Sequence, residues 1–120
     1  MSCKNNAVNI AVKAADAKMG RDIAVLNIEE LTTLTGYFVI VTGGSPSNIQ
    51  AICDHIEDKM AEAGLKMLNK EGYNTAEWVL LGYEDVIIHI FQKEARDFYM
   101  LEHIWKDAKK VDIDDLLIEQ

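Results

Sequence analysis

Residues 37–46 read Tyr-Phe-Val-Ile-Val-Thr-Gly-Gly-Ser-Pro, and this stretch decides the fold. Its first six residues are all β-branched or aromatic, which is typical of a buried strand. The two glycines end that strand. Ser45 can then cap the free amides of a helix, and Pro46 suits the first helical position because no amide donor is needed there. The stretch therefore predicts a strand joined by a tight turn to a helix.

Helical periodicity continues after this turn. Apolar side chains recur every three or four residues, at Ile49, Ile52, Cys53, Ile56 and Met60. This spacing predicts an amphipathic helix that runs to about Ala63 and is closed by Gly64. A similar stripe predicts an earlier helix over residues 6–19, and a β-branched run predicts a strand over residues 22–27.

The second half of the chain should add strands and a last helix. An extended piece is expected over residues 65–68, followed by strands over 77–81 and 86–92. The connection between the last two strands is too short for a parallel crossover, so they should form an antiparallel hairpin. A final helix is predicted over residues 94–108. The order α-β-β-α-β-β-β-α predicts an α/β (α+β) fold with a single mixed sheet flanked by helices.

The length of the chain bounds the number of domains. A chain of 120 residues can bury one useful core and is too short for two ordinary ones. We therefore predict a single domain over residues 1–108. Residues 111–120 carry four acidic side chains and no basic one, so residues 109–120 are predicted to form an acidic, loosely held tail.

The charge balance bears on the partner. Twenty acidic residues against twelve basic ones give a formal net charge of −8. Such a surface repels the phosphates of nucleic acids, so direct sequence-specific nucleic-acid binding is not expected. If the chain has a macromolecular partner, a basic protein fits better.

Cysteine usage and hydropathy bear on the compartment. Cys3 and Cys53 lack Cys-x-x-Cys spacing and the density of a disulfide scaffold, so both are predicted to be free thiols in a reducing environment. The N-terminus has no apolar signal-peptide core, and no apolar run is long enough to span a membrane. We therefore expect a cytoplasmic protein that is not associated with membranes.

The turn of residues 42–46 could in principle hold a phosphate, because glycines let a backbone approach an anion at the start of a helix. A structural turn is favoured, since such turns are common and no Walker lysine follows. The turn also resembles the start of a nucleotidyltransferase motif, which needs two carboxylates on a nearby strand to hold metals. The candidate strand, residues 78–82, contains none.

The histidines give no metal signature. His55, His89 and His103 are spread over a helix, a strand and another helix without ligand-type spacing. His89 lies within an apolar strand and is best explained as a hydrogen-bonded structural histidine. We therefore predict no catalytic residue, no metal site and no cofactor.

The last helix carries more aromatic and apolar side chains than one core stripe requires. Among them are Phe98, Tyr99, Met100, Leu101 and Trp105. Some of these should face a neighbour or a partner, since Tyr, Trp and Arg often anchor interfaces. The alternative, that they fill the core of a small domain, stays open.

The ordered set of motifs resembles one family, over about residues 14–108. The motifs are Asp22-Ile23, Tyr37-Phe38-Val39-Ile40, Thr42-Gly43-Gly44-Ser45, Glu71-Gly72, Trp78-Val79-Leu80-Leu81, Asp85-Val86-Ile87-Ile88-His89-Ile90-Phe91 and Arg96-Asp97-Phe98-Tyr99-Met100-Leu101-Glu102-His103-Ile104-Trp105. In this order and spacing they are similar to the ribosomal silencing factor, or Iojap-like, family. The strand that bears the histidine, followed by Arg-x-x-Tyr-x-Leu-Glu-x-x-Trp, is the most specific part.

The resemblance implies a fold related to nucleotidyltransferases without their catalysis, and commonly a homodimer. It also implies binding to large-subunit ribosomal protein fourteen, a basic protein at the subunit interface. The large ribosomal subunit could then not join the small one, and translation would be repressed under nutrient stress. The motifs that match the family, and their interface-prone chemistry, indicate Trp78, Leu80, Tyr83, Arg96 and Tyr99 as the partner-binding residues.

Two positions depart from the family pattern, and two rival functions stay open. The family usually has Asp where this chain has Gly36 and Gly82. Losing both carboxylates weakens any residual metal or nucleotide site. The rivals are a nucleotidyltransferase-like enzyme, which the Gly-Ser turn favours, and a dimeric adaptor for another basic protein, which the acidic surface favours.

Overall fold

The computed structural model describes residues 6–33 and 35–117, and for Glu102 and Ile104 only the backbone. Cys3 and Glu119 lie outside the described residues. The elements are α1 (Asn6–Ala17), β1 (Arg21–Asn27), β2 (Tyr37–Gly43), α2 (Pro46–Glu62), β3 (Asn69–Glu71), β4 (Trp78–Gly82), β5 (Val86–Gln92), α3 (Lys93–Tyr99), α4 (Leu101–Ile104), β6 (Lys109–Lys110) and the 3-10 turn η1 (Asp114–Leu116).

The strands form one mixed sheet in the order β3-β4-β5-β2-β1-β6. β2 and β5 are parallel, and every other neighbouring pair is antiparallel. The predicted α/β (α+β) fold with a single mixed sheet is confirmed, as is the antiparallel hairpin of β4 and β5. The predicted extended piece at residues 65–68 was misplaced, because the strand that pairs with β4 begins only at Asn69.

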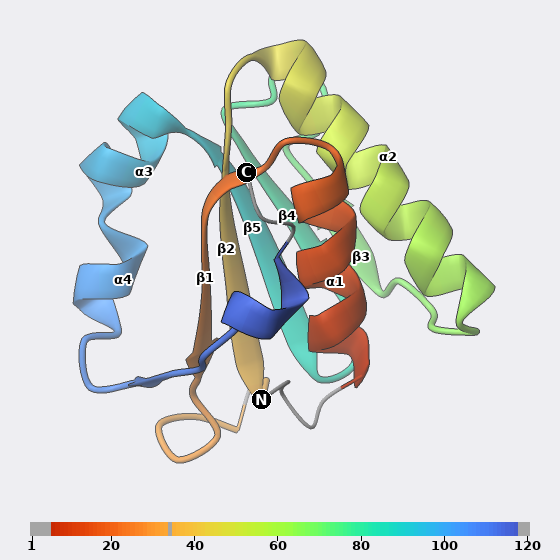
Figure 1. The fold of residues 1–120 in the computed structure, drawn as a ribbon. Helices are drawn as coiled ribbons and strands as arrows, with labels where there is room; N and C mark the ends of the chain where they lie inside the picture. The colour runs from red at the N-terminus through yellow and green to blue at the C-terminus, as the bar shows by residue number, and fades with distance from the viewer. Residues whose placement is uncertain (1–5, 34, 118–120) are drawn as a thin grey trace.

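Helices cover both faces of the sheet (Figure 1). α1 and α2 lie on one face, and α3 and α4 lie on the other. The main core fills the α1/α2 face and includes Val39, Val41 and Ile90, all with no exposed surface. A smaller cluster, which includes Phe38 and Phe91, lies under α3 and α4. Alternate residues of each strand enter the two clusters, because successive side chains of a strand point to opposite faces.

α2 begins where the sequence predicts. Ser45 accepts a hydrogen bond from the Asn48 amide through its hydroxyl (3.1 Å), and Pro46 occupies the first helical position. Cys53, in the middle of the helix, is a free and fully buried thiol, as predicted. Burial raises its pKa to about 12, so the unreactive thiol form predominates at neutral pH.

Removing the cap should weaken this helix. We expect Ser45→Ala to lower the free energy of unfolding by about 1 kcal/mol, because the Asn48 amide loses its acceptor. Urea denaturation measures the change. Ser47→Ala is the matched control, since it removes a neighbouring hydroxyl and leaves the capping oxygen in place. Equal midpoints for Ser45→Ala and wild type would contradict the capping role.

The prediction of one continuous final helix was wrong. α3 ends at Tyr99, Met100 adopts a left-handed conformation (φ 49°, ψ 47°), and α4 follows as a short helix. Apolar residues continue through the break, so helical periodicity alone could not reveal it. The change of direction lets Leu101 and Trp105 pack on the cluster under α4, while Phe98 points away from it with 78% of its surface exposed.

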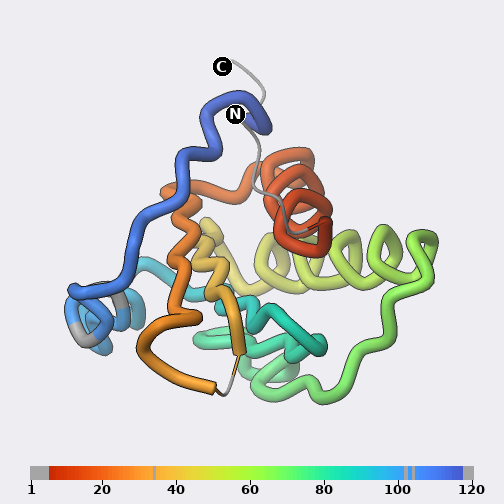
Figure 2. Tube along the Cα trace, turned by 90° about the horizontal axis from the view of Figure 1, so that it is seen from below, coloured from red at the N-terminus to blue at the C-terminus, as the bar shows by residue number. Residues whose placement is uncertain are grey.

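The prediction of a loosely held tail was also wrong for the described residues that follow α4. Lys109 and Lys110 form β6 and pair with the end of β1. Ile113 and Leu116 are then buried in the main core, with 6% and 7% of their surface exposed. Figure 2 shows this segment running alongside β1 toward α1. The boundary of the predicted domain at residue 108 therefore cuts through packed structure.

Candidate functional site

The candidate site is built on one row of the sheet beneath α3. Thr42 on β2 is paired with Phe91 on β5, and Phe91 is paired with Trp78 on β4. Residues that are paired in this way point to the same face of a sheet. α3 follows β5 directly and crosses this row, so its last turn comes to lie beside Trp78.

Three aromatic or polar neighbours contact the Trp78 ring. The Phe91 ring stacks on it with 4.9 Å between centroids, and the Tyr99 ring lies 4.6 Å away. The indole N–H of Trp78 donates a hydrogen bond to Nδ1 of His89 (3.0 Å). The residue is only half-buried, so part of it remains accessible to solvent while these three neighbours hold the ring.

Exposed hydrophobic side chains continue from Trp78 onto α3. Phe98, Tyr99 and Met100 expose 78%, 45% and 50% of their surfaces, and the rings of Phe98 and Tyr99 make an edge-to-face contact at 5.1 Å. Leu80 is half-buried and lies two residues from Trp78 on the same sheet face. We call Trp78, Leu80, Phe98, Tyr99 and Met100 the hydrophobic patch. Contiguous exposed apolar residues of this kind mark interaction surfaces.

The structure brings together three of the five residues predicted to bind a partner: Trp78, Leu80 and Tyr99. Arg96 lies on α3 near them, but its guanidinium Nη1 donates to the Asp22 carbonyl (2.5 Å) and to the Thr42 hydroxyl (2.8 Å). These two hydrogen bonds attach α3 to β1 and β2.

Tyr83 does not join the patch. It follows β4, is 94% buried and packs in the core on the α1/α2 face, where burial raises its pKa to about 12. Sequence reasoning left Phe98 and Met100 out of the predicted site. The surplus of apolar residues around the last helix was the signal that could have included them.

His89 is a hydrogen-bonded core histidine, as the sequence predicts. Only 4% of its surface is exposed, and its ring lies among aromatic rings, edge-to-face with Phe38 at 4.8 Å. Burial lowers its pKa from 6.5 to about 4, because desolvation penalises the charged imidazolium. At neutral pH the ring is therefore neutral and can accept the indole hydrogen bond.

This pKa shift predicts a pH dependence of stability. The unfolded state takes up a proton near pH 6.5 and the folded state does so only near pH 4, so the histidine's contribution is fully present above pH 6.5 and is lost as the pH falls toward 4. We expect wild type to lose on the order of 3 kcal/mol through this group alone. His89→Asn should lack that component.

Urea denaturation of both proteins between pH 7 and pH 4 measures the effect. The carboxylates titrate in both proteins. The difference between their profiles of unfolding free energy against pH therefore gives the contribution of His89. Parallel profiles for wild type and His89→Asn would contradict the shifted pKa.

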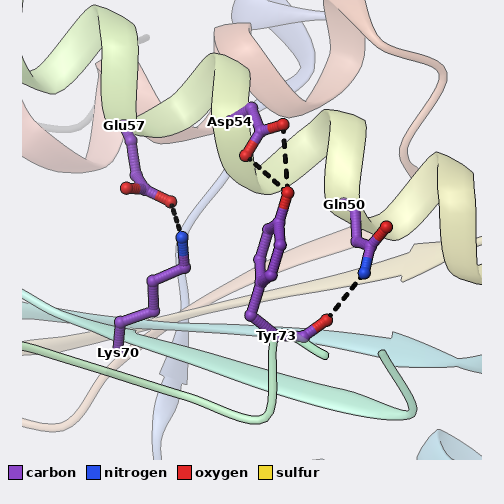
Figure 3. Close-up of polar contacts among 5 residues, drawn as sticks. All are labelled: Gln50, Asp54, Glu57, Lys70 and Tyr73. Carbon is purple, nitrogen blue, oxygen red and sulfur yellow. Dashed lines mark hydrogen bonds and ion pairs between the residues drawn. The ribbon is translucent and has the colours of Figure 1, made fainter. Parts of the chain in front are cut away.

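Polar contacts with α2 hold the segment that leads into β4 (Figure 3). Lys70 on β3 forms an ion pair with Glu57 (2.7 Å). The hydroxyl of Tyr73 donates to Asp54 (3.0 Å), which raises the pKa of Tyr73, and Gln50 donates to the Tyr73 carbonyl (3.0 Å). These contacts hold β3, the edge strand of the sheet, and the segment after it against α2. Leu80 of the hydrophobic patch lies on the neighbouring strand, β4.

Asn48, in the first turn of α2, makes hydrogen bonds with the Gly-Ser turn. The Gly44 amide donates to the side-chain oxygen of Asn48 (2.9 Å), and the Ser45 hydroxyl accepts from the Asn48 amide. The Asn48 side-chain amide in turn donates to the Lys18 carbonyl (2.9 Å). These contacts support the structural explanation of the turn. Among the described residues, no group of three or more His, Cys, Asp or Glu side chains is arranged to hold a metal ion.

The two glycines that depart from the family pattern lie against polar side chains. A Cβ at Gly36 would lie 2.7 Å from an Asp85 carboxylate oxygen, and one at Gly82 would overlap the Asn69 side-chain oxygen. In this chain, side-chain oxygens from neighbouring residues thus occupy the space beside both glycines. A larger residue at either position would have to displace them.

Comparisons with known proteins agree with these observations. A family model described as "Ribosomal silencing factor during starvation" matches residues 2–120. A protein of Bacillus subtilis named "Ribosomal silencing factor RsfS" is 38% identical over 107 residues, which cover 89% of this chain and 91% of that protein. The maize protein named "Protein Iojap, chloroplastic" is 33% identical over 114 residues, covering 92% of this chain and 48% of that protein.

Structural comparison gives the same result. The crystal structure of a Chromobacterium violaceum protein superposes with a TM-score of 0.83 at 30% identity and covers 88% of each chain. In the part of the chain that the structure describes, no helix is both long and apolar enough to cross a lipid bilayer. On its sequence and its fold, this chain belongs to the ribosomal silencing factor family.

Proposed function

We propose that this protein acts in the cytoplasm by binding the large ribosomal subunit, and that it blocks subunit joining without any catalytic step. Large-subunit ribosomal protein fourteen is the proposed contact. The observation that carries the proposal is the hydrophobic patch, in which three neighbouring side chains of α3 and its end, Phe98, Tyr99 and Met100, are each at least 45% exposed.

The chemistry of the patch suits a protein partner. Aromatic residues and methionine are enriched at the centres of protein interfaces, and rigid aromatic rings lose little conformational entropy on binding. Trp78 is already held by three neighbours in the free protein, so little further ordering of this ring is needed on binding.

The charge of the protein suits a basic partner. The formal net charge is −8. Glu71 on β3 is exposed and is paired with Leu80, so it lies on the sheet face that bears the patch. Complementary charge increases the rate of association and makes it dependent on salt.

The mechanism that we propose is steric. A bound domain occupies the surface on which the small subunit would dock, so subunit joining fails while the protein remains bound. The family resemblance also implies a homodimer, which we include in the proposal. Sedimentation velocity of the free protein measures that state independently of the ribosome.

Co-sedimentation tests the proposal directly. The purified protein is mixed with isolated large subunits at low and moderate salt, and small subunits are then added. We expect the protein to sediment with large subunits, more strongly at low salt, and the fraction of joined ribosomes to fall as its concentration rises. Bovine serum albumin, another acidic protein, is the control.

The outcomes separate the candidate functions. Binding together with fewer joined ribosomes supports occlusion. Binding with unchanged subunit joining would overturn the occlusion mechanism while leaving ribosome association. A protein that stays at the top of the gradient at both salt concentrations would overturn the ribosomal proposal, and an adaptor for another basic protein would take its place.

A further inference from the structure

The geometry of β4 and β5 makes His89 a diagonal neighbour of Trp78. The residue paired with Trp78 is Phe91, and the residue paired with Leu80 is His89. All four side chains therefore lie on the same face of the sheet. A diagonal neighbour is within reach of a large aromatic side chain. The indole nitrogen of Trp78 uses this reach to contact His89 Nδ1.

The hydrogen bond fixes the chemical state of His89. An indole nitrogen is only a donor, so Nδ1 must be the unprotonated nitrogen, and the proton of the neutral ring lies on Nε2. The Nε2 atom is buried and has no hydrogen-bond partner. A buried donor without a partner is unfavourable for stability. An apolar residue would suit this cluster better, so packing alone does not explain a histidine.

What the histidine supplies is an acceptor for Trp78. The imidazole plane is itself held by rings on the same face, since Phe38 meets it edge-to-face at an angle of 84° and the Phe91 ring lies nearly parallel to it at 6.1 Å. Without the acceptor, the Trp78 ring would have to turn its N–H toward water to keep a partner. That rotation would change the shape of the hydrophobic patch, because Trp78 also contacts Tyr99.

We propose that His89 is a positioning residue that sets the orientation of the Trp78 indole, and so pre-forms the hydrophobic patch for its protein partner. The inference deepens the proposed function and rests on it only for the consequence in binding. The orientation itself is a property of the free protein.

The first measurement is made on the free protein by NMR. The two tryptophans give two indole N–H signals, and Trp105→Phe identifies the signal of Trp78. His89→Asn places an amide oxygen near the position of Nδ1 and keeps an acceptor, whereas His89→Leu and His89→Phe keep bulk without one. We expect the Trp78 indole proton to be protected from solvent exchange in wild type and His89→Asn, and to exchange faster in the other two variants.

The second measurement is binding to isolated large subunits. We expect His89→Asn to bind within about twofold of wild type, and His89→Leu and His89→Phe to bind about fivefold to tenfold more weakly, the range of one neutral hydrogen bond. Thermal unfolding checks that each variant is folded, and His89→Phe replaces His89→Leu if the latter is not. In a Trp78→Phe background, which lacks the donor, replacing His89 should weaken binding no further.

The outcomes distinguish this inference from the proposed function. Wild-type protection of the Trp78 indole proton in folded His89→Leu or His89→Phe would overturn the positioning role, as would wild-type affinity in either variant. If wild type itself fails to bind large subunits, the proposed function is lost, and the NMR comparison alone then decides whether His89 orients Trp78.

Discussion

Tyr99→Ala should weaken binding to the large ribosomal subunit by about 30-fold or more, the effect expected for an aromatic side chain at the centre of an interface. Tyr99 is 45% exposed, so its removal should leave the free energy of unfolding within about 0.5 kcal/mol of wild type. Trp78→Ala should weaken binding at least as much, because its loss also removes a neighbour of the Tyr99 ring. Co-sedimentation over a range of subunit concentrations measures both effects.

Leu31→Ala is the matched control for this prediction. Leu31 is 46% exposed, close to the value for Tyr99, and it lies in the connection between β1 and β2 at the opposite end of the sheet. Its substitution should leave binding unchanged. Wild-type affinity in Tyr99→Ala would exclude the hydrophobic patch as the contact surface, and equal losses in Tyr99→Ala and Leu31→Ala would indicate a non-specific effect.

The second large effect concerns stability. Replacing both Ile113 and Leu116 by alanine should lower the free energy of unfolding by about 3 kcal/mol or more, because each side chain is more than nine-tenths buried in the main core. Urea denaturation at constant pH measures the change. Leu68→Ala is the control, since Leu68 is 63% exposed and should change stability by less than about 0.5 kcal/mol.

This comparison also tests the packing of the segment after β6. If the double variant unfolds at the same urea concentration as wild type, the segment after β6 is loosely attached, as its acidic composition suggested. A large loss would agree with the packed position of the segment after β6. Its acidic side chains would then be the solvated face of a packed segment whose apolar residues enter the core.

The candidate site was predictable only in part. Aromatic chemistry and family resemblance selected Trp78, Leu80 and Tyr99, which the fold does bring together. The same reasoning selected Tyr83, which lies on the α1/α2 side of the sheet. Strand alternation could have excluded it, because Tyr83 is an odd number of residues from both Trp78 and Leu80 and therefore falls on the opposite face of the sheet.

The sequence by itself determined the elements that depend on local chemistry. The run of β-branched and aromatic residues specified β2, Ser45 and Pro46 specified the start of α2, and the short connection after β4 specified an antiparallel hairpin. Each of these signals acts between residues close together in the chain, where side-chain sterics, capping and loop length have their effect.

Only the tertiary structure decided how distant elements meet. The parallel pairing of β2 with β5 aligns Thr42 with Phe91, and through Phe91 with Trp78. The left-handed turn at Met100 directs Leu101 and Trp105 into the core and leaves the end of α3 exposed. Burial of apolar surface between segments far apart in the chain drives these arrangements, and a local pattern of residues does not specify which segments will meet.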